Sequence, residues 1–245
     1  MKKSEKITLN VQNLCKNYGK IQASNNLNFS AQNGEIIALL GPNGAGKSTL
    51  MNMIAGYLAA TSGKIEILGH NIADFPIFAK ENIGFLPEGS PLYADLSVKR
   101  FLCYMAELRG LKHNAVEKAA LIANIIDVFN QKIETLSKGY QRRVGFAQSI
   151  LSNPPILLLD EPTDGLDPNQ KDYMRSLIRQ MAKDKTIIIS THLLEEAETV
   201  CNRVIILDKG QIKFDGKLSA LLKQTKTKNI ADAFRKITAQ ENENE

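Results

Sequence analysis

Short apolar runs recur along the chain, and each predicts a β-strand. The continuously apolar ones are "IIALL" (36–40), "ILLL" (156–159) and "TIIIS" (186–190). Continuous runs are typical of central parallel strands that helices cover on both faces. The full set of strand-like runs is 7–11, 27–31, 35–40, 64–68, 82–87, 155–160, 186–191, 203–208 and 211–216.

Apolar residues at helical spacing fill two stretches between these runs. The residues are Val98, Phe101, Leu102, Met105 and Leu108 within 97–109, and Val116, Ala119, Ala120, Ala123, Ile126 and Phe129 within 115–129. Such stripes indicate helix packing rather than a cofactor site. Residues 90–150 as a whole favour helices, whereas the flanking regions alternate strand and helix. The pattern therefore predicts an α/β chain with an inserted helical subdomain.

The predicted organisation is one large domain with a short C-terminal addition. The domain spans 1–222, with a core at about 1–87 and 151–222 and the helical subdomain at about 88–150. Residues 223–245 contain "NIADAFRKIT", which predicts a closing helix with Ile230, Ala233 and Phe234 on one face, followed by a polar tail.

Composition narrows the functional classes only slightly. The chain has 245 residues, 43% of them hydrophobic, a net charge of +5 and three widely separated cysteines. The charge permits an anionic partner but selects none. The cysteines show neither metal-ligand nor disulfide spacing, which favours a reducing cytosolic setting. No secretory signal and no membrane-spanning run is visible, so we expect a soluble chain.

A phosphate-binding loop follows the run at 35–40 and precedes a helix candidate. Its sequence "GPNGAGKST" matches GxxxxGK[ST] in the strand–loop–helix context that this motif requires. A chance match in a chain of this length is on the order of 1%, so a plain Gly-rich turn is the weaker alternative. Lys47 is expected to reach the β- and γ-phosphates, and Ser48 to ligate Mg²⁺. The binding residues are Gly41, Pro42, Asn43, Gly44, Ala45, Gly46, Lys47, Ser48 and Thr49.

Two carboxylates end the run at 155–160. Asp160 is placed to hold Mg²⁺ through its waters, and Glu161 to polarise the water that attacks the γ-phosphate. Two acids at the end of a strand are common by themselves. Beside a phosphate loop they become a strong candidate for phosphoryl-transfer chemistry.

A second anion-binding element lies in "LSKGYQRRVG", residues 136–145. A Ser and a Gly stand there at the expected start of a helix, where backbone N–H groups and the helix dipole hold anions. Arg142 and Arg143 in this stretch favour a solvated helix face over support of a phosphate. One compact domain has no evident use for two phosphate-binding elements.

Four ordered motifs resemble those of ATP-binding cassette (ABC) ATPases, over about residues 7–216. They are "GPNGAGKST", "LSKGY", "ILLLDEPTDGLDP" and "ISTH". The resemblance implies a P-loop NTPase core with an inserted helical subdomain and an N-terminal antiparallel β region. It also implies ATP and Mg²⁺ as cofactors, and two head-to-tail copies in which each signature motif closes the site of the other.

The resemblance implies roles for five further residues. Ser137 and Gly139 would contact the γ-phosphate held by the opposite copy, and Asp167 would lie in the loop that crosses the interface. His192 would touch the γ-phosphate and link to the catalytic Glu161. Tyr18 would stack on adenine. Taken alone, Tyr18 is better explained as a half-buried strand residue, and His192 as a structural histidine.

Three positions depart from the usual family pattern. Lys138 and Tyr140 replace a glycine and a glutamine of the signature, and Glu88 replaces a glutamine at the hinge of the helical lobe. Glu88 could meet the metal or its waters. These departures resemble the branch that serves ABC-2-type exporters, including drug-export and gliding-motility-type subunits.

The resemblance also implies partners and a location. We expect an ATP-dependent homodimer that drives a separate transmembrane permease, in the cytoplasm at the inner face of the membrane, with no specific nucleic acid partner. A soluble family member acting on nucleic acid or ribosomes is the weaker alternative, because those members usually carry two cassettes or long coiled coils, whereas this chain shows one cassette with about ninety residues between the phosphate loop and the signature. A P-loop kinase would need neither "LSKGY" nor "GLDP". The transported substrate is set by the permease.

Overall fold

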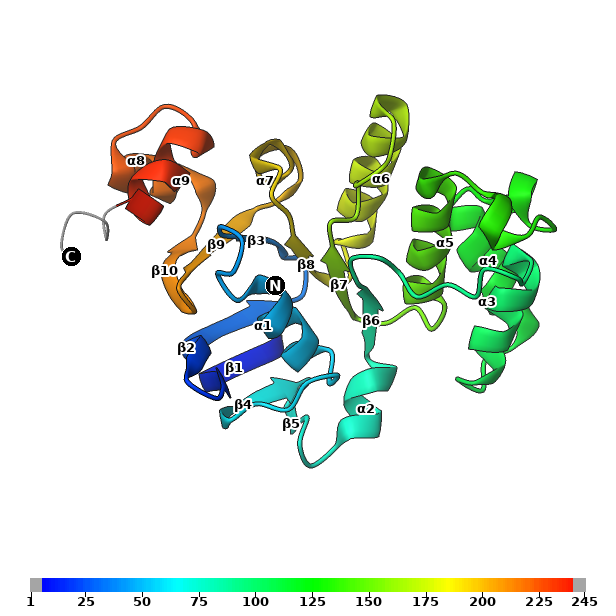
Figure 1. Ribbon diagram of the computed structural model, residues 1–245, viewed down its shortest axis with the longest axis horizontal. Helices are drawn as coiled ribbons and strands as arrows, with labels where there is room; N and C mark the ends of the chain where they lie inside the picture. The colour runs from blue at the N-terminus through cyan, green and yellow to red at the C-terminus, as the bar shows by residue number, and fades with distance from the viewer. Residues whose placement is uncertain (1–5, 240–245) are drawn as a thin grey trace, which may run out of the picture.

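A computed structural model describes residues 6–239, which form two sheets with helices packed around them (Figure 1). The larger sheet has the order β10-β9-β3-β8-β7-β6, and only the β9–β10 pair is antiparallel. Its strands are β3 (Ile36–Leu40), β6 (Ile83–Leu86), β7 (Ile156–Asp160), β8 (Thr186–Ser190), β9 (Arg203–Asp208) and β10 (Gln211–Gly216).

The smaller sheet is antiparallel, with the order β2-β1-β4-β5. Its strands are β1 (Ile7–Tyr18), β2 (Ile21–Gln32), β4 (Ser62–Ile67) and β5 (His70–Asn71). Every strand predicted from an apolar run is present, and the two-residue β5 is an additional one. The α/β fold with an N-terminal antiparallel region is confirmed.

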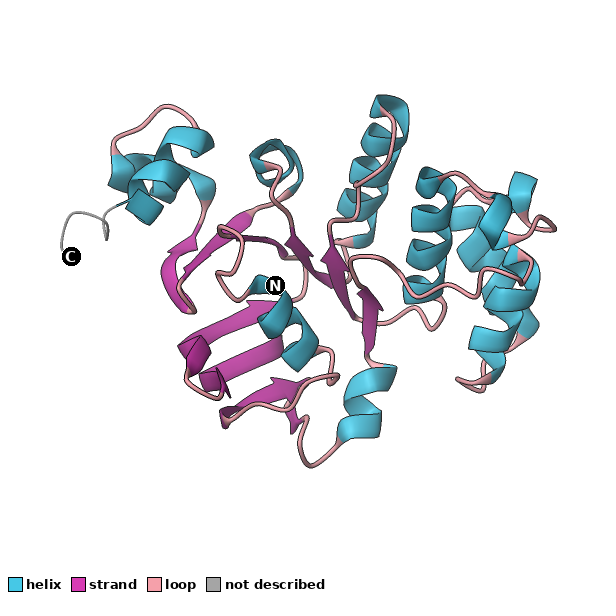
Figure 2. Cartoon of the chain, viewed as in Figure 1, coloured by secondary structure: helices cyan, strands magenta, loops and turns pink. Residues whose placement is uncertain are grey.

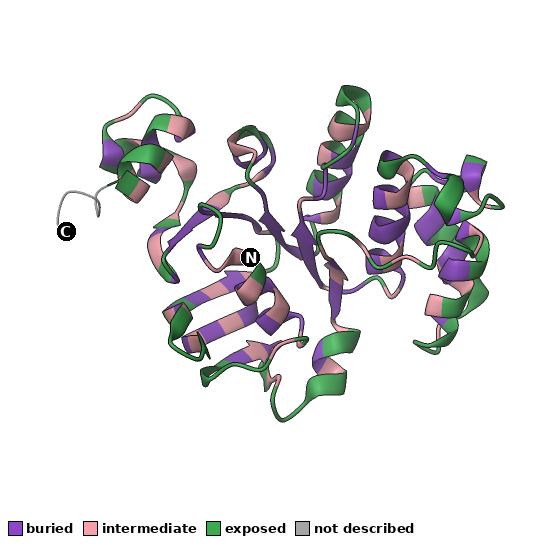
Figure 3. Ribbon diagram, viewed as in Figure 1, coloured by how far each residue is buried: buried purple, intermediate pink, exposed green. Residues whose placement is uncertain are grey.

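The continuously apolar strands form the centre of the larger sheet. Every residue of β3, β7 and β8 is buried. Alternate side chains face two different clusters, because successive side chains of a strand point to opposite faces. Leu157 and Leu159 join the cluster with the helical subdomain, whereas Ile156 and Leu158 join the cluster with the antiparallel sheet and α1. Figure 3 shows this buried centre in purple.

Helices surround the larger sheet (Figure 2). Their bounds are α1 (Lys47–Ile54), α2 (Pro76–Glu81), α3 (Val98–Glu107), α4 (His113–Ile122), α5 (Lys138–Ile150), α6 (Pro168–Met181), α7 (Leu194–Val200), α8 (Leu218–Thr225) and α9 (Ile230–Ala239), with 3₁₀ turns η1 (Ile126–Val128) and η2 (Ile133–Thr135). The short α2 escaped prediction, since six residues cannot display a helical period.

The helices α3, α4 and α5 gather at the end of the molecule next to β6, as the apolar pattern predicted (Figure 1). Two details of the prediction are wrong. Leu108 is 63% exposed and lies outside the buried stripe. The stretch 115–129 is not one helix, because α4 ends at Ile122 and Asn124 has a φ of 51°. Arg143 donates hydrogen bonds to the carbonyl oxygens of Ala123 and Asn124, so these backbone acceptors just after the helix end have partners.

The C-terminal segment packs on the far end of the sheet. Helix α9 covers the stretch in which the sequence places a closing helix: Ile230 and Ala233 are buried in a cluster with β3, β9 and α8, and Phe234 packs against that cluster. Helix α8 runs across residue 222, where the sequence placed the domain boundary. The polar tail at 240–245 lies outside the described residues.

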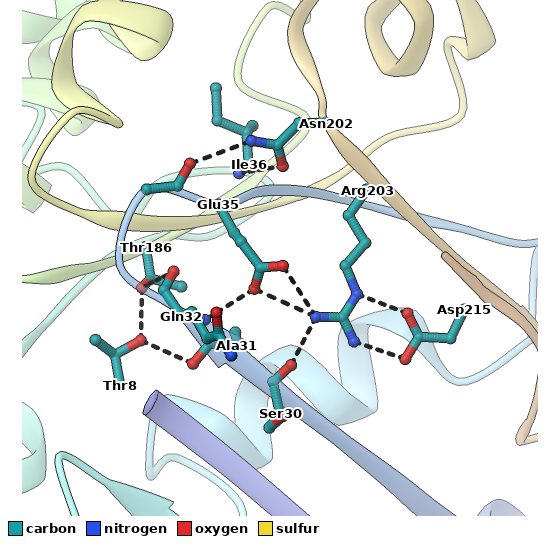
Figure 4. Close-up of polar contacts among 11 residues, drawn as sticks. Thr8, Ser30, Ala31, Gln32, Glu35, Ile36, Thr186, Asn202, Arg203 and Asp215 are labelled. Carbon is teal, nitrogen blue, oxygen red and sulfur yellow. Dashed lines mark hydrogen bonds and ion pairs between the residues drawn. The ribbon is translucent and has the colours of Figure 1, made fainter. Parts of the chain in front are cut away.

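Polar contacts join the two sheets on the side shown in Figure 4. Arg203 of β9 donates Nε and Nη2 to Asp215 at 2.7 Å each, and Nη1 to the Ser30 carbonyl at 2.8 Å and to Glu35 at 3.2 Å. Hydrogen bonding to Asp215 raises the pKa of Arg203. The Thr8 and Thr186 hydroxyls lie 2.5 Å apart. These ties fix the sheets against each other at the amino end of β3, opposite the end from which the loop leads to α1.

Candidate active site

The loop between β3 and α1 has no room for a side chain at two positions. Gly46 is the N-cap of α1 with a φ of 100°, and a Cβ there would meet the Ala23 carbonyl oxygen at 2.3 Å. A Cβ on Gly41 would meet the Leu207 carbonyl oxygen at 2.4 Å. The loop is therefore pressed against β2 and β9, with α1 beginning at Lys47. That arrangement leaves the first N–H groups of α1 free to bind an anion.

A cavity of about 550 Å³ opens beside this loop. It brings together residues from well-separated parts of the chain, as the sequence predicted for the phosphate loop, the two carboxylates, Glu88 and His192. The lining residues are Ala23, Asn43, Gly44, Ala45, Gly46, Lys47, Ser48, Thr49, Glu88, Asp160, Glu161, Asp164, Ser190 and His192.

Lys47 is the only lysine or arginine among the described residues that line the cavity. Its ammonium donates to the carbonyl oxygens of Gly41 at 2.6 Å and Pro42 at 3.0 Å. Burial lowers the pKa of Lys47, and the carboxylates of Glu161, Asp160 and Glu88 act in the opposite direction. The ammonium is thus held at the loop where phosphate oxygens would replace the two carbonyls.

Glu161 sits on a constrained turn after β7. Its φ is 50°, and its N–H donates to the Ser190 carbonyl at 2.8 Å. Its carboxylate accepts hydrogen bonds from the Thr191 hydroxyl at 3.1 Å and the His192 N–H at 2.9 Å, and lies 2.8 Å from His192 Nδ1. The His192 ring is 63% exposed and faces the cavity. The structure therefore places His192 in contact with the carboxylate to which the resemblance linked it.

Asp160 is buried at the end of β7. Burial raises its pKa, and the nearby carboxylates of Glu88 and Glu161 raise it further. A cavity lined by four carboxylates, those of Glu88, Asp160, Glu161 and Asp164, and one ammonium has an excess of negative charge, which would oppose a nucleoside triphosphate. A cation brought with the nucleotide would offset this repulsion.

The oxygen donors at the cavity suit Mg²⁺. Ser48, Asp160 and Glu88 all line it. No group of three His, Cys, Asp or Glu side chains in the described part of the chain is arranged to hold a metal by itself. Proteins often bind Mg²⁺ with one or two carboxylates together with waters and substrate phosphates. The donor set therefore fits a Mg²⁺ ion that binds with its nucleotide.

Arg142 was expected on a solvated helix face, and that interpretation is wrong. Arg142 and Arg143 are 8% and 5% exposed. Arg142 donates to the Pro87 carbonyl at 2.7 Å, to the Ser90 hydroxyl at 3.3 Å, and to the Asp160 carbonyl. It thus links α5 to the strand that ends in the carboxylates and to the segment that carries Glu88. The sequence did not reveal this role of Arg142, because its hydrogen-bond acceptors belong to residues distant in the chain.

The signature residues lie away from the cavity of their own chain. Ser137 is exposed and caps α5 by accepting a hydrogen bond from the Tyr140 N–H at 3.3 Å. Asp167 is exposed and caps α6, accepting from the Gln170 N–H at 3.0 Å. Gly139 is buried beside the Gly165 carbonyl. None of the three lines the cavity.

Two other residues bear on the sequence predictions. Tyr18, at the end of β1, is 49% exposed with the Lys16 ammonium 5.2 Å from its ring centre, and it does not line the cavity. Its role toward adenine stays a prediction.

Tyr140 donates its hydroxyl to Asp127, and the Arg143 guanidinium lies 5.1 Å from the Tyr140 ring centre. The residue that departs from the usual signature therefore anchors the start of α5 to η1.

The parallel sheet, the glycine loop opening α1 and the carboxylates after β7 define the chain as a P-loop nucleotide-binding protein. The model of the ABC transporter family matches residues 24–164. YxlF, an ABC transporter ATP-binding protein of Bacillus subtilis, is 36% identical over 89% of this chain and 74% of the relative. The Nod factor export ATP-binding protein I of Burkholderia orbicola is 34% identical over 87% and 72%. The chain belongs to the ATP-binding proteins of ABC transporters.

Solved structures agree with this assignment. The ATP-binding subunit of an ABC transporter superposes with a TM-score of 0.87 at 28% identity, covering 94% of this chain and 99% of the other. A dimeric ATP-binding cassette in a post-hydrolysis state, bound to ADP and Pi, gives a TM-score of 0.78 at 27% identity, covering 86% and 98%. The predicted family and ATPase class are confirmed. Within residues 6–239, no helix has the length and apolar character needed to cross a membrane.

Proposed function

We propose that two copies of this chain bind ATP head to tail and that its hydrolysis drives a separate transmembrane permease of the ABC-2 exporter type. The observation that carries the proposal is the separation of the signature from the cavity. Ser137 and Asp167 are exposed and absent from the cavity lining of their own chain. A second copy can supply these groups to the γ-phosphate, and the dimeric relative bound to ADP and Pi supports that arrangement.

Each residue of the cavity then has a chemical task. Lys47 and the N–H groups of residues 43–49 bind the β- and γ-phosphates, and Ser48, Asp160 and Glu88 hold Mg²⁺, which neutralises phosphate charge. Glu161 accepts a hydrogen bond from the attacking water and polarises it. Thr191 and His192 hold the Glu161 carboxylate through contacts of 2.8 to 3.1 Å. Tyr18 stacks on adenine, while Ser137, Gly139 and Asp167 act on the nucleotide of the partner copy.

A groove at the junction of the core and the helical subdomain supports the permease as partner. It has a volume of about 630 Å³ and is lined by exposed apolar side chains, including Tyr57, Ile77 and Leu108. Arg109 lines it as well, and its Nη1 donates to the Gln148 carbonyl at 2.9 Å. Burial lowers the pKa of this guanidinium. We infer that the groove receives a cytoplasmic helix of the permease, and that the chain works at the inner face of the membrane.

The export direction draws on the Nod factor export relative and on the Glu88, Lys138 and Tyr140 departures. The alternative, a soluble ATPase acting on nucleic acid or ribosomes, gains no support from the relatives described above. Copurification from cells that express the native neighbouring genes separates the two. Recovery with membranes supports the permease, whereas recovery with ribosomes in the soluble fraction would replace it.

The composite site is tested with Glu161→Gln. This variant should bind MgATP and sediment as a dimer when saturated, while its phosphate release falls by roughly 10²–10⁴. Adding Ser137→Ala should return the MgATP-bound protein to a monomer, because the γ-phosphate loses its contact from the partner copy. Ser176→Ala, on the exposed face of α6, is the matched control and should leave the dimer intact. A strictly monomeric Glu161→Gln protein at high concentration, or a Ser137→Ala enzyme with unchanged turnover, would overturn the composite site.

A further inference from the structure

Helix α7 carries a buried carboxylate to which the proposed chemistry gives no task. Glu196 is 2% exposed, one turn beyond His192. Its Oε1 accepts a hydrogen bond from the hydroxyl of Thr163, which is also buried. Its Oε2 has no hydrogen-bond partner among the described residues. A buried carboxylate costs free energy unless it is well compensated, so its presence beside the active site calls for a reason.

Thr163 and Glu196 belong to the two segments that form the catalytic side of the cavity. Thr163 stands two residues after Glu161, and Glu196 stands four residues after His192. Nearer the sheet, these segments are joined by the Glu161 N–H to the Ser190 carbonyl and by the contacts of Thr191 and His192 with the Glu161 carboxylate. The Thr163–Glu196 bond is a further tie, located on the side away from β7 and β8.

The segment that Thr163 anchors is conformationally constrained. Glu161 has a φ of 50°, in the left-handed region that favours glycine. A side-chain-bearing residue keeps such a conformation only when its surroundings fix the backbone on both sides. The Ser190 carbonyl fixes Glu161 from the strand side. On the other side the Glu161 carbonyl accepts a hydrogen bond from the Asp164 N–H at 3.1 Å, and Thr163, which lies between these two residues, is tied to Glu196.

The charges around Glu196 come from several elements. Burial raises its pKa, while the Thr191 hydroxyl and the cations Arg175 and Lys171 of α6 lower it and the Glu161 carboxylate raises it. The Thr191 hydroxyl donates its single proton to Glu161, so Thr191 contacts that carboxylate and lies near Glu196 as well. Glu196 is therefore linked to Glu161 in two ways: the charges of the two carboxylates interact, and Glu196 lies four residues after His192, which contacts Glu161.

We propose that Thr163 and Glu196 are a positioning pair that holds the loop at 161–164 against the start of α7, so that Glu161 keeps its alignment with His192 and the attacking water. The pair touches neither nucleotide nor water. This inference rests on the proposed role of Glu161. It predicts a selective loss of turnover when the pair is broken, with nucleotide affinity preserved, because the phosphate loop lies outside the tied segments.

The test compares variants of both partners in the full chain. Thr163→Val removes the hydroxyl and keeps the shape, Thr163→Ser restores a hydroxyl, and Glu196→Met removes the acceptor with a side chain of similar length. Steady-state phosphate release, equilibrium MgATP binding and thermal unfolding are measured for each. Thr199→Val, on the exposed side of the same helix, is the matched control.

Thr163→Val and Glu196→Met should lower kcat at least tenfold with a KM for MgATP within about threefold, which marks an interaction needed only in the transition state. Thr163→Ser should stay within threefold of the wild type in kcat. Replacing a buried charge with an apolar side chain is often neutral or stabilising. A folded Glu196→Met protein with reduced kcat therefore excludes a purely structural role, and it decides the question even if Thr163→Val fails to fold.

Two contrary outcomes are distinguishable. If wild-type protein hydrolyses MgATP and both pair variants keep kcat within twofold, or lose nucleotide affinity in step with kcat, the positioning pair is refuted and the proposed function stands. If wild-type protein does not hydrolyse MgATP, or Glu161→Gln is as active as the wild type, the proposed function is refuted and the pair with it.

Discussion

Gly46 offers the sharpest test of how the phosphate loop is built. Gly46→Ala places a Cβ 2.3 Å from the Ala23 carbonyl oxygen on a backbone with a φ of 100°. Two effects follow, and they act on different quantities. The strained φ costs about 1–3 kcal/mol in folded protein with or without nucleotide, so it lowers stability. The clash with a backbone atom forces the loop to move, so it lowers nucleotide affinity.

The size of the affinity loss follows from the hydrogen bonds at stake. Hydrogen bonds to charged groups contribute about 1.5–3 kcal/mol each. If the displaced loop forfeits two of its contacts with the phosphates, binding weakens by about 3–6 kcal/mol, or roughly 10²–10⁴ in Kd. We therefore expect Gly46→Ala to be folded but less stable, and to bind MgATP at least a hundredfold more weakly by titration calorimetry.

Gly69→Ala is the matched control. Gly69 lies in the turn between β4 and β5 with a φ of 85°, and a Cβ there meets nothing within 4 Å. Gly69→Ala therefore has the strained backbone φ but no steric clash, and it lies away from the cavity. It should lower the melting temperature and leave the Kd for MgATP within about threefold of the wild type. If Gly46→Ala bound MgATP as tightly as Gly69→Ala, the contact with Ala23 would not be what shapes the loop.

Two further predictions concern stability. Asp160 has a pKa raised above 3.8 by burial, so the folded protein binds its proton more tightly than the unfolded chain does, and stability is lost as the pH rises from 3.8 through the raised pKa. Asp160→Asn should therefore melt higher than the wild type at pH 7, with the difference shrinking as the pH falls toward 3.8; an equal advantage at every pH would exclude this cause. Tyr140→Phe should lower the melting temperature by about 2–4 °C through the loss of about 1 kcal/mol of bonding to Asp127. Adding Asp127→Asn should cost little more, and Tyr104→Phe, whose hydroxyl makes no hydrogen bond among residues 6–239, should change nothing.

The local pattern was sufficient for the strands and for the motif residues. A run such as "TIIIS" predicts a central strand because burial on both faces leaves no place for a polar side chain, and β8 is buried throughout. The phosphate loop was equally visible, because its glycines are required by contacts such as that of Gly46 with Ala23. These features are determined by residues that are close together in the chain.

The predictions that failed depend on distant partners. An arginine on a helix looks solvated until its acceptors are known, and those of Arg142 are Pro87, Ser90 and Asp160. The end of α4 at Ile122 likewise goes with a distant partner, because Arg143 donates to the carbonyl oxygens of the two residues just beyond it. Apolar periodicity alone predicted helical packing through the whole of 115–129.

The sequence by itself determined the class of the core, the position of the phosphate loop and the identity of the carboxylates, because each is set by a local pattern of burial or backbone freedom. Only the tertiary structure decided that Arg142 reaches the Asp160 carbonyl and that Thr163 reaches Glu196, whereas the contact of His192 with Glu161 was expected only through the family resemblance. Such contacts join segments that the chain brings together only when the sheet and its helices have packed, so no local pattern encodes them.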